Sequence, residues 1–163
     1  MAAPLKLFDV PVSNHGARAR ILLYGKRLGP TKVAIISPMA EFPEGGLKSV
    51  EYLKLSPQGK MPMLQTDSGL CIAESSAIFS YLTDRFSDSD PSFIPQTAEE
   101  RAISNMITCI HDNYLSGIQG CLYKAMSVEE RSMKLKELSK QIDVIEHHMS
   151  AGPFVAGKEI SQG

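Results

Sequence analysis

The sequence predicts an α/β domain followed by an all-α domain, and three observations carry that prediction. Up to residue 86, short apolar runs and helical patterns alternate in the order strand, helix, strand, short helix, strand, strand, helix. Residues 87–96, SDSDPSFIPQ, are polar and contain two prolines, as is typical of a linker. Beyond them, apolar residues recur every three or four positions in two long stretches. We therefore expect domains at 1–86 and 97–163, joined by the linker 87–96.

Strands and helices of the first domain follow from local patterns. The expected strands are LKLF at 5–8, TKVAII at 31–36, MPMLQT at 61–66 and LCIA at 70–73. Asp67, Ser68 and Gly69 separate the last two strands with residues typical of a hairpin turn. The expected helices are 16–28, 47–55 and 74–86, and residues 39–46 are expected to form a loop.

Two long amphipathic helices are predicted for the second domain. The first is expected from Thr97 to about Met126 and the second from Ser127 to about Met149. Ser127, with Glu130 three residues later, predicts a capping box. The apolar residues expected on one face of the second helix are Leu135, Leu138, Ile142, Ile145 and Met149. An antiparallel pair with its apolar stripes packed together is the expected result.

Composition and charge limit the function classes. The 163 residues carry a formal net charge of −1 without a basic stripe, which argues against a nucleic-acid partner. Three cysteines without a Cys-x-x-Cys pair favour a reducing compartment. The N-terminus lacks a secretory signal pattern, and no apolar run approaches the ~18 residues of a membrane span. A cytosolic protein without a membrane partner is expected, and no metal site is predicted.

The stretch SPQGKMPML at 56–64 places Pro62 where a strand should begin. Proline lacks a backbone donor and therefore belongs at a strand start, an edge or a bulge. A cis Met61–Pro62 bond would turn an edge of the backbone outward, but only about one X–Pro bond in twenty is cis. Glu74 and Ser75 open the third helix, where free amides favour a carboxylate. From these residues alone, an ordinary turn and a simple helix cap are the favoured readings.

Three segments together resemble the cytosolic glutathione transferases: SNHGARARILLYGKRL, LSPQGKMPML and CIAESSAIFSYLTDRF. The later segment GPFVAGKEIS is similar to the part that follows the second long helix in that family. The resemblance covers essentially the whole chain. It implies a thioredoxin-like N-terminal domain with the order βαβαββα and a mixed four-stranded sheet. A helical domain, here mainly two long helices, would follow.

The resemblance also implies how glutathione would bind as co-substrate. A cis Met61–Pro62 bond would leave the Met61 main chain free to pair with the cysteinyl part of glutathione, in the manner of an added strand. Ser75 would take the γ-glutamyl carboxylate and Glu74 its amine. Lys60 and, with less support, Lys48 would lie near the glycyl carboxylate. The alternative for each lysine is a solvated surface residue.

Ser13 is the predicted catalytic residue, as a thiolate stabiliser and not as a nucleophile. A free thiol has a pKa of about 8.5, and lowering it by about two units takes roughly 2.7 kcal/mol. In the serine-using classes of the family, the serine that contacts the sulfur stands five residues before an arginine, as Ser13 stands before Arg18. The competing interpretation is that Ser13 only caps the helix. Asn14 is an equally good cap and would leave Ser13 free.

Other nucleophiles and bases fit less well. His15 is more typical of a surface residue than of a base. No cysteine lies in the loop before the first helix, which makes thiol transfer less favoured. No tyrosine occurs there either, and Tyr24 is too deep in the helix. Cys71 is expected to be buried in a strand, and Cys109 and Cys121 to be structural residues of the long helix.

The second substrate would be a hydrophobic electrophile lying against the helical domain. His111 and Tyr114, with Ile118 and Tyr123, are the candidates to border it, although helix packing explains them equally well. Relatives continue with further helices beyond the segment that ends this chain, where Ser161 is expected to be an N-cap. Partly uncovered apolar faces on the two long helices are therefore expected. The protein would then be marginally stable, would rely on a dimer partner, or would continue in a C-terminal part that the given sequence lacks. A homodimer is the expected partner arrangement. The alternatives are a non-catalytic docking module built on the same fold and a glutathione-dependent thiol transferase.

Overall fold

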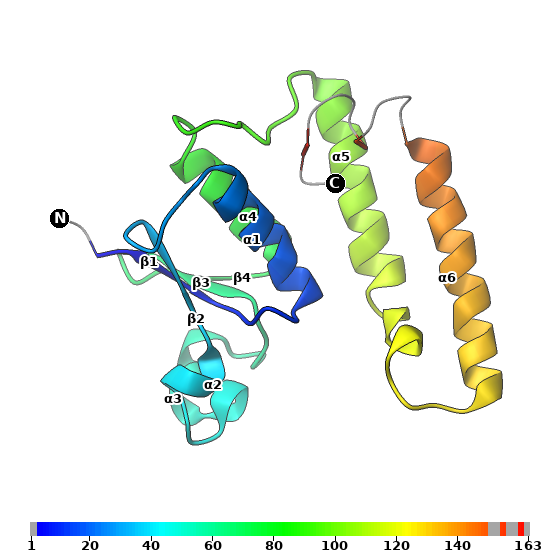
Figure 1. Ribbon diagram of the computed structural model, residues 1–163, viewed down its shortest axis with the longest axis horizontal. Helices are drawn as coiled ribbons and strands as arrows, with labels where there is room; N and C mark the ends of the chain where they lie inside the picture. Colours follow the sequence, from blue (N-terminus) through cyan, green and yellow to red (C-terminus); the bar gives the residue numbers. More distant parts are fainter. Residues whose placement is uncertain (1–2, 150–153, 156–159, 162–163) are drawn as a thin grey trace. The chain divides into compact units, whose positions relative to one another are not determined.

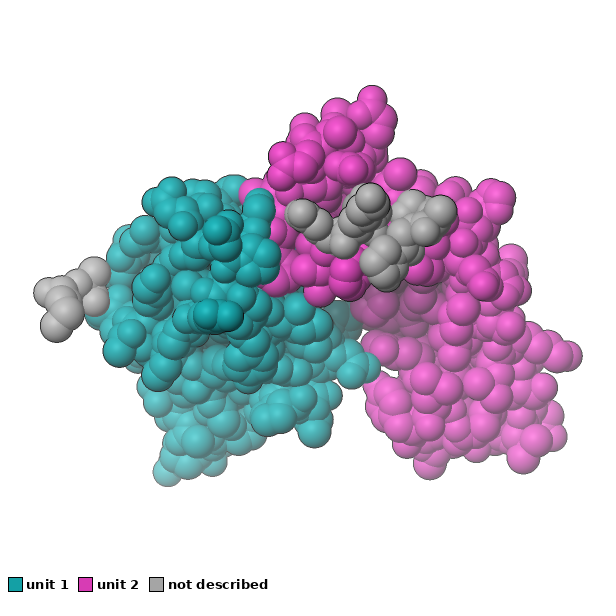
Figure 2. All heavy atoms as spheres, turned by 45° about the horizontal axis from the view of Figure 1, so that its top comes forward, with its two compact units in different colours: residues 1–92 teal, residues 93–163 magenta. Residues whose placement is uncertain are grey.

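The computed structural model describes residues 3–149, 154–155 and 160–161. The chain divides into two compact units, one ending at Ser92 and the other beginning at Phe93. Figure 2 shows the two units in different colours. The division falls inside the expected linker 87–96, which also contains a cis Asp90–Pro91 bond.

A mixed four-stranded sheet forms the centre of the first unit, as predicted (Figure 1). Its strands are β1 (Leu5–Phe8), β2 (Val33–Ile36), β3 (Met63–Gln65) and β4 (Cys71–Ala73), in the order β2-β1-β3-β4. β2 runs parallel to β1, whereas β3 is antiparallel to both β1 and β4. The parallel pair is joined by a helix, since parallel strands need a crossover connection.

Five helical segments accompany the sheet. They are α1 (Asn14–Gly25), α2 (Pro38–Glu41), the 3₁₀ turn η1 (Gly46–Lys48), α3 (Val50–Leu55) and α4 (Ser75–Arg85). α1 ends at Gly25 and not at residue 28, because Arg27 takes a φ of 54°, outside the helical region. α2 lies in the segment expected to be a loop, where Pro38 occupies the first helical position after Ser37.

Each face of the sheet is covered by different helices. α1 and α4 pack side by side over one face (Figure 1). Strand alternation places Leu7 and Leu64 on that face, and both are fully buried. On the opposite face, Phe8 and Met63 pack with Tyr52 of α3 in one buried cluster. Tyr52 meets Phe8 edge-on, with ring centroids 5.9 Å apart.

Gly59 ends a tight turn that brings the chain to Pro62. Its φ is +58°, and a Cβ there would lie 2.8 Å from the Leu47 carbonyl oxygen and 2.9 Å from Lys48 Nζ. Gly69 has a φ of +86° but nothing within 4 Å of the same position. We expect Gly69→Ala to cost about 1–2 kcal/mol for the left-handed backbone. Gly59→Ala should cost about 1–3 kcal/mol more, because the added methyl also clashes.

Urea unfolding of the two glycine variants measures this difference. The two share the backbone penalty, so the gap between their free energies of unfolding isolates the close approach at Gly59. Equal losses in both variants would show that the Leu47 and Lys48 contacts place no demand on position 59.

The second unit contains two long helices, but the first is shorter than predicted. α5 spans Ala98–Ile110 and continues as a π-helical turn, η2 (His111–Leu115). A 3₁₀ turn, η3 (Gln119–Leu122), precedes α6 (Val128–His148). The predicted helix to Met126 is therefore wrong in its last part. Gly117 and Gly120 disfavour continuation, and Arg131 donates to the carbonyl oxygens of Cys121 and Lys124.

Helix capping also differs from the prediction. Thr97 and Glu100 form a complete capping box at the start of α5, which the sequence analysis did not identify. At the start of α6, the Ser127 hydroxyl accepts from the Glu130 amide at 3.1 Å. No return bond from the Glu130 side chain to Ser127 is found among the contacts of the described residues. Only half of the predicted box is therefore formed.

The predicted apolar stripe of α6 is partly wrong. Gln141 is the buried residue of this helix, and Leu138 and Ile145 are half-buried beside it. Leu135, Ile142 and Met149 are 40%, 50% and 42% exposed. The expectation of partly uncovered apolar faces is therefore met on α6. Of the segment 152–161, only 154–155 and 160–161 are described, and there the Ser161 hydroxyl bonds that of Ser104 at 3.2 Å.

None of the described helices combines the length and apolar character that crossing a membrane requires.

Candidate functional site

Three segments singled out from the sequence meet at one end of the sheet. Phe8 pairs with Met63, and Met63 pairs with Ala73, so these residues form one row across three strands. The segment leading to Ser13 leaves the row after Phe8, Pro62 enters it before Met63, and Glu74 and Ser75 follow Ala73. The strand register therefore brings together segments that are far apart in the sequence, since Phe8 and Ala73 belong to the same row.

Ser13 is the N-cap of α1, so of the two caps that the sequence offered, Ser13 and not Asn14 is used. The Ser13 hydroxyl oxygen accepts a hydrogen bond from the Gly16 amide at 3.0 Å. Asn14 occupies the first helical position instead. Capping uses a lone pair of the hydroxyl and not its proton, so the O–H remains available as a donor. Capping and thiolate stabilisation by Ser13 are thus compatible and need not be alternatives.

Ser75 is buried at the first position of α4 and is held by an arginine from α1. Arg18 Nη1 donates to the Ser75 hydroxyl oxygen at 2.9 Å. The side chain of Arg18, five residues after Ser13, therefore links α1 to the start of α4. Because Ser75 accepts this bond, its own proton is left to donate to a ligand.

Glu74 precedes α4 with a left-handed backbone, φ 68° and ψ 120°. Its side chain makes no capping hydrogen bond, although it occupies the N-cap position, and it is exposed. Simple capping by the Glu74 side chain is therefore not what the structure contains. A non-glycine residue with positive φ costs of order 1–3 kcal/mol and is concentrated at ligand-binding sites.

The Met61–Pro62 bond is cis, as the resemblance implied. Within the described parts of the chain, no hydrogen bond reaches the main chain of Met61. The preceding carbonyl, that of Lys60, accepts from the Tyr52 hydroxyl at 2.7 Å and from the Ser56 hydroxyl at 3.3 Å. Tyr52 thus ties the turn before Pro62 to α3.

Ionisation of Tyr52 is expected to make the stability of the fold depend on pH. Burial raises the pKa of Tyr52 to about 12 from 10.0. The unfolded chain therefore loses this proton first, and the stabilisation is complete below pH 10 and is lost as the pH rises toward 12. Wild type should exceed Tyr52→Phe by about 0.5–1.5 kcal/mol at pH 8 through the bond to Lys60. Urea unfolding at pH 8, 10 and 11 should show this advantage shrinking only above pH 10.

The two lysines expected near the glycyl carboxylate lie on either side of the same turn. Lys48 belongs to η1, and its Nζ lies beside Gly59, directly before Lys60. Lys60 is exposed, and its backbone is fixed by Tyr52 and Ser56. The structure therefore places the Lys48 amino group beside the turn that carries Lys60 and leads to Pro62.

His111 and Tyr114 lie in η2 of the second unit. His111 Nδ1 is 2.8 Å from Asp112 Oδ1, and Tyr114 is 56% exposed. π-Helical turns are rare in proteins, and those that occur are often found at functional sites. The role of His111 and Tyr114 toward a second substrate stays a prediction.

The cysteines differ from expectation in burial. Cys71 is half-buried and Cys109 is exposed, whereas Cys121 is buried. All three are free thiols. Cys71 is therefore not the buried strand residue that was expected, and Cys109, expected to be a structural residue of the long helix, is exposed on α5. Among the described residues, no group of three or more His, Cys, Asp or Glu side chains is arranged to hold a metal ion.

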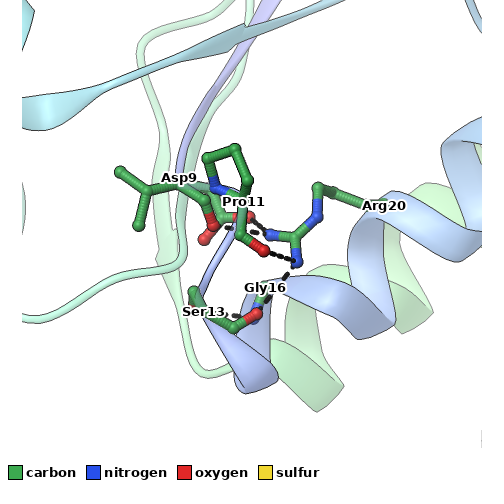
Figure 3. Close-up of polar contacts among 6 residues, drawn as sticks. Asp9, Pro11, Ser13, Gly16 and Arg20 are labelled. Carbon is green, nitrogen blue, oxygen red and sulfur yellow. Dashed lines mark hydrogen bonds and ion pairs between the residues drawn. The ribbon is translucent and has the colours of Figure 1, made fainter.

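Sequence reasoning missed the residues that organise the loop before α1. Asp9 is buried beside Gly16, and Arg20 reaches back from α1 to several oxygens of this loop (Figure 3). The only signal in the sequence is an acidic residue eleven positions before an arginine, which is too common to identify a pair.

Comparisons with known proteins agree with this geometry. A family profile for the N-terminal domain of glutathione S-transferase matches residues 7–90, more than half of the chain. Glutathione S-transferase 3 of Zea mays is 25% identical over 171 residues, covering 98% of this chain and 73% of the maize protein. Maleylacetoacetate isomerase of Pseudomonas aeruginosa is 32% identical over 111 residues, covering 64% of this chain. The alignment spans 49% of that bacterial protein.

Solved structures show the same fold. A diazinon-metabolizing glutathione S-transferase of the silkworm Bombyx mori has a TM-score of 0.80 at 23% identity, over 97% of this chain and 74% of that one. A delta-class glutathione transferase of Nilaparvata lugens has a TM-score of 0.73 at 25% identity, over 98% of this chain and 73% of that one. With the profile match extending from β1 through α4, the chain belongs to the glutathione S-transferase family.

Proposed function

We propose that this chain binds glutathione and conjugates it, through its thiol sulfur, to small electrophilic molecules. The observation that carries the proposal is the meeting of Ser13, the cis Met61–Pro62 bond and Ser75 at one end of the sheet. A docking module would need none of these features together. The names of the maize relative and of the silkworm structure support the same activity.

In this proposal each end of glutathione has its own partners. Ser75 donates its hydroxyl proton to the γ-glutamyl carboxylate, and Arg18 adds positive charge behind it. The Glu74 side chain is exposed and makes no capping hydrogen bond, and in this proposal it binds the γ-glutamyl amine. The Met61 main chain pairs with the cysteinyl part as an added strand would. Lys60 and Lys48 attract the glycyl carboxylate.

Ser13 then acts on the sulfur. The glutathione thiol loses its proton to solvent, and the Ser13 hydroxyl donates a hydrogen bond to the thiolate. The amides of the first turn of α1 add their partial positive charge. The thiolate attacks the electrophilic carbon, a sulfur–carbon bond forms, and the leaving group departs with the electron pair of its bond. Ser13 is not consumed, because it only donates a hydrogen bond.

The finer assignments belong to the same proposal. A hydrophobic electrophile lies against the helical unit, with His111 and Tyr114 at its border. The active form is a cytoplasmic homodimer with a detoxification role. Half-exposed apolar residues on α6, such as Ile142 and Met133, support the need for further covering surface.

Calorimetric titration with glutathione, followed by a conjugation assay with a chromophoric aryl halide, tests the proposal. Binding in the micromolar-to-millimolar range together with thioether formation is the expected result. S-Methylglutathione, which cannot ionise at sulfur, should bind but give no product. A folded protein that binds neither compound would contradict the proposal and favour the docking module. Disulfide exchange without thioether formation would favour the thiol transferase.

A further inference from the structure

Arg20 holds almost the entire segment that carries Ser13. Its Nη1 contacts the Asp9 carboxylate and donates to the Val10 carbonyl oxygen at 2.9 Å. Its Nη2 donates to the carbonyl oxygens of Pro11 and Ser13, each at 3.0 Å. Figure 3 shows the Arg20 guanidinium facing Asp9, Pro11 and Ser13. One planar side chain thus fixes four of the five residues between β1 and α1.

The polar atoms of Ser13 are almost all committed to this arrangement. Its amide donates to the Val10 carbonyl, and its own carbonyl accepts from Arg20 and from the Ala17 amide. Its hydroxyl oxygen accepts from Gly16. Among contacts with other described residues, the hydroxyl proton is the one group of Ser13 without a partner. The oxygen from which that proton can be donated is therefore held in place by the Gly16 amide and by a backbone that Arg20 contacts.

Asp9 places a buried negative charge beneath the same helix start. Its side chain is fully buried, and its carboxylate occupies the space that a Cβ on Gly16 would need. One carboxylate oxygen contacts Arg20, and the other has no hydrogen-bond partner among the described residues. An uncompensated carboxylate here would oppose a thiolate at Ser13, because like charges raise the pKa of an acid. Arg20 removes this opposition.

We propose that Arg20 is the positioning residue of the thiolate site: it aims the Ser13 hydroxyl and neutralises Asp9. The inference rests on the proposed function, since it assumes a glutathione sulfur at Ser13. Arg20 itself does not touch the substrate. Arg20 contributes both a positive charge and a planar fork of donors. Replacement by Lys keeps the charge but not the fork, so Arg20→Lys separates the two contributions.

The test compares Arg20→Gln and Arg20→Lys with wild type. The readout is the thiolate absorbance of bound glutathione as a function of pH, together with kcat and KM. Arg20→Gln should raise the pKa of the bound thiol by about one unit or more and lower kcat about tenfold below that pKa. At pH 9 most of kcat should return, because the thiol then ionises without help. KM for glutathione should change less than about threefold, since the Ser75 end is untouched.

Two further variants separate positioning from folding. Arg131→Gln is the control, because Arg131 also donates to backbone carbonyl oxygens, those of Cys121 and Lys124 in the second unit. It should lower stability without moving the thiol pKa. Asp9→Asn combined with Arg20→Gln removes both charges and should return part of the pKa shift. If Arg20→Gln alone does not fold, the pKa of the bound thiol is measured on this double variant.

The outcomes are distinct. Wild type that shows no thiolate at pH 7 would overturn the proposed function and this inference with it. Wild type with a thiolate that Arg20→Gln leaves unchanged, beside a lowered melting temperature, would overturn the inference alone and make Arg20 a structural residue. A shift in the thiol pKa that the double variant partly reverses would support it.

Discussion

Ser13→Ala is expected to lower kcat/KM for glutathione conjugation at pH 6.5 by about 100-fold or more, as loss of one preorganised donor does elsewhere. In the proposed function, the hydroxyl that caps α1 donates to the sulfur, and its oxygen is already fixed by the Gly16 amide. Without it, the thiol of bound glutathione should titrate closer to its free value of about 8.5. Thiolate absorbance against pH measures this directly, and kcat should recover as the pH approaches that value.

The same change removes a helix cap, so stability must be separated from catalysis. Ser127→Ala provides the matched control, because the Ser127 hydroxyl oxygen caps α6 in the same way, by accepting a hydrogen bond from a backbone amide. Both variants should lose about 0.5–2 kcal/mol of stability, and only Ser13→Ala should lose activity. Ser13→Asp makes the converse comparison: it keeps a good cap but sets a carboxylate against the thiolate. Full activity in Ser13→Asp would contradict the assignment.

Much of the first unit was predictable because its elements depend on short-range patterns. Alternation and turn residues placed all four strands, and the Asp67–Gly69 turn joined the last two. The cis Met61–Pro62 bond was not predictable from local residues, which favoured trans. It was implied only by the resemblance to the glutathione transferases, which is information about the family and not about the turn.

Long-range side-chain contacts explain what the sequence did not predict. Arg18 bonds Ser75 across 57 positions, and no periodicity links an arginine on one helix with a serine on another. The end of α5 failed for a related reason. Apolar spacing continued through Ile118 and Leu122, yet Gly117, Gly120 and the contacts of Arg131 broke the helix. Periodicity records which residues suit a helix and not which backbone groups a distant side chain will bind.

Ser75→Ala should weaken glutathione binding by about ten- to 100-fold, since a hydrogen bond to a charged group contributes about 1.5–3 kcal/mol. The buried hydroxyl is the group that the γ-glutamyl carboxylate would meet, and its bond to Arg18 at 2.9 Å holds it in place. Calorimetric titration measures the change in Kd. Ser80→Ala is the control, because Ser80 lies exposed on the same helix, and it should leave Kd unchanged.

A ligand that lacks the γ-glutamyl group makes the comparison specific. Cysteinylglycine keeps the thiol and the glycyl carboxylate, so it should bind wild type and Ser75→Ala with affinities within about twofold of each other. An effect of Ser75→Ala on glutathione alone locates the lost interaction at the γ-glutamyl end. Equal weakening of both ligands would instead mean that Ser75 supports the start of α4 and that another group receives the γ-glutamyl carboxylate. Arg18 would then be the next residue to replace, because its guanidinium is the charge nearest to that hydroxyl.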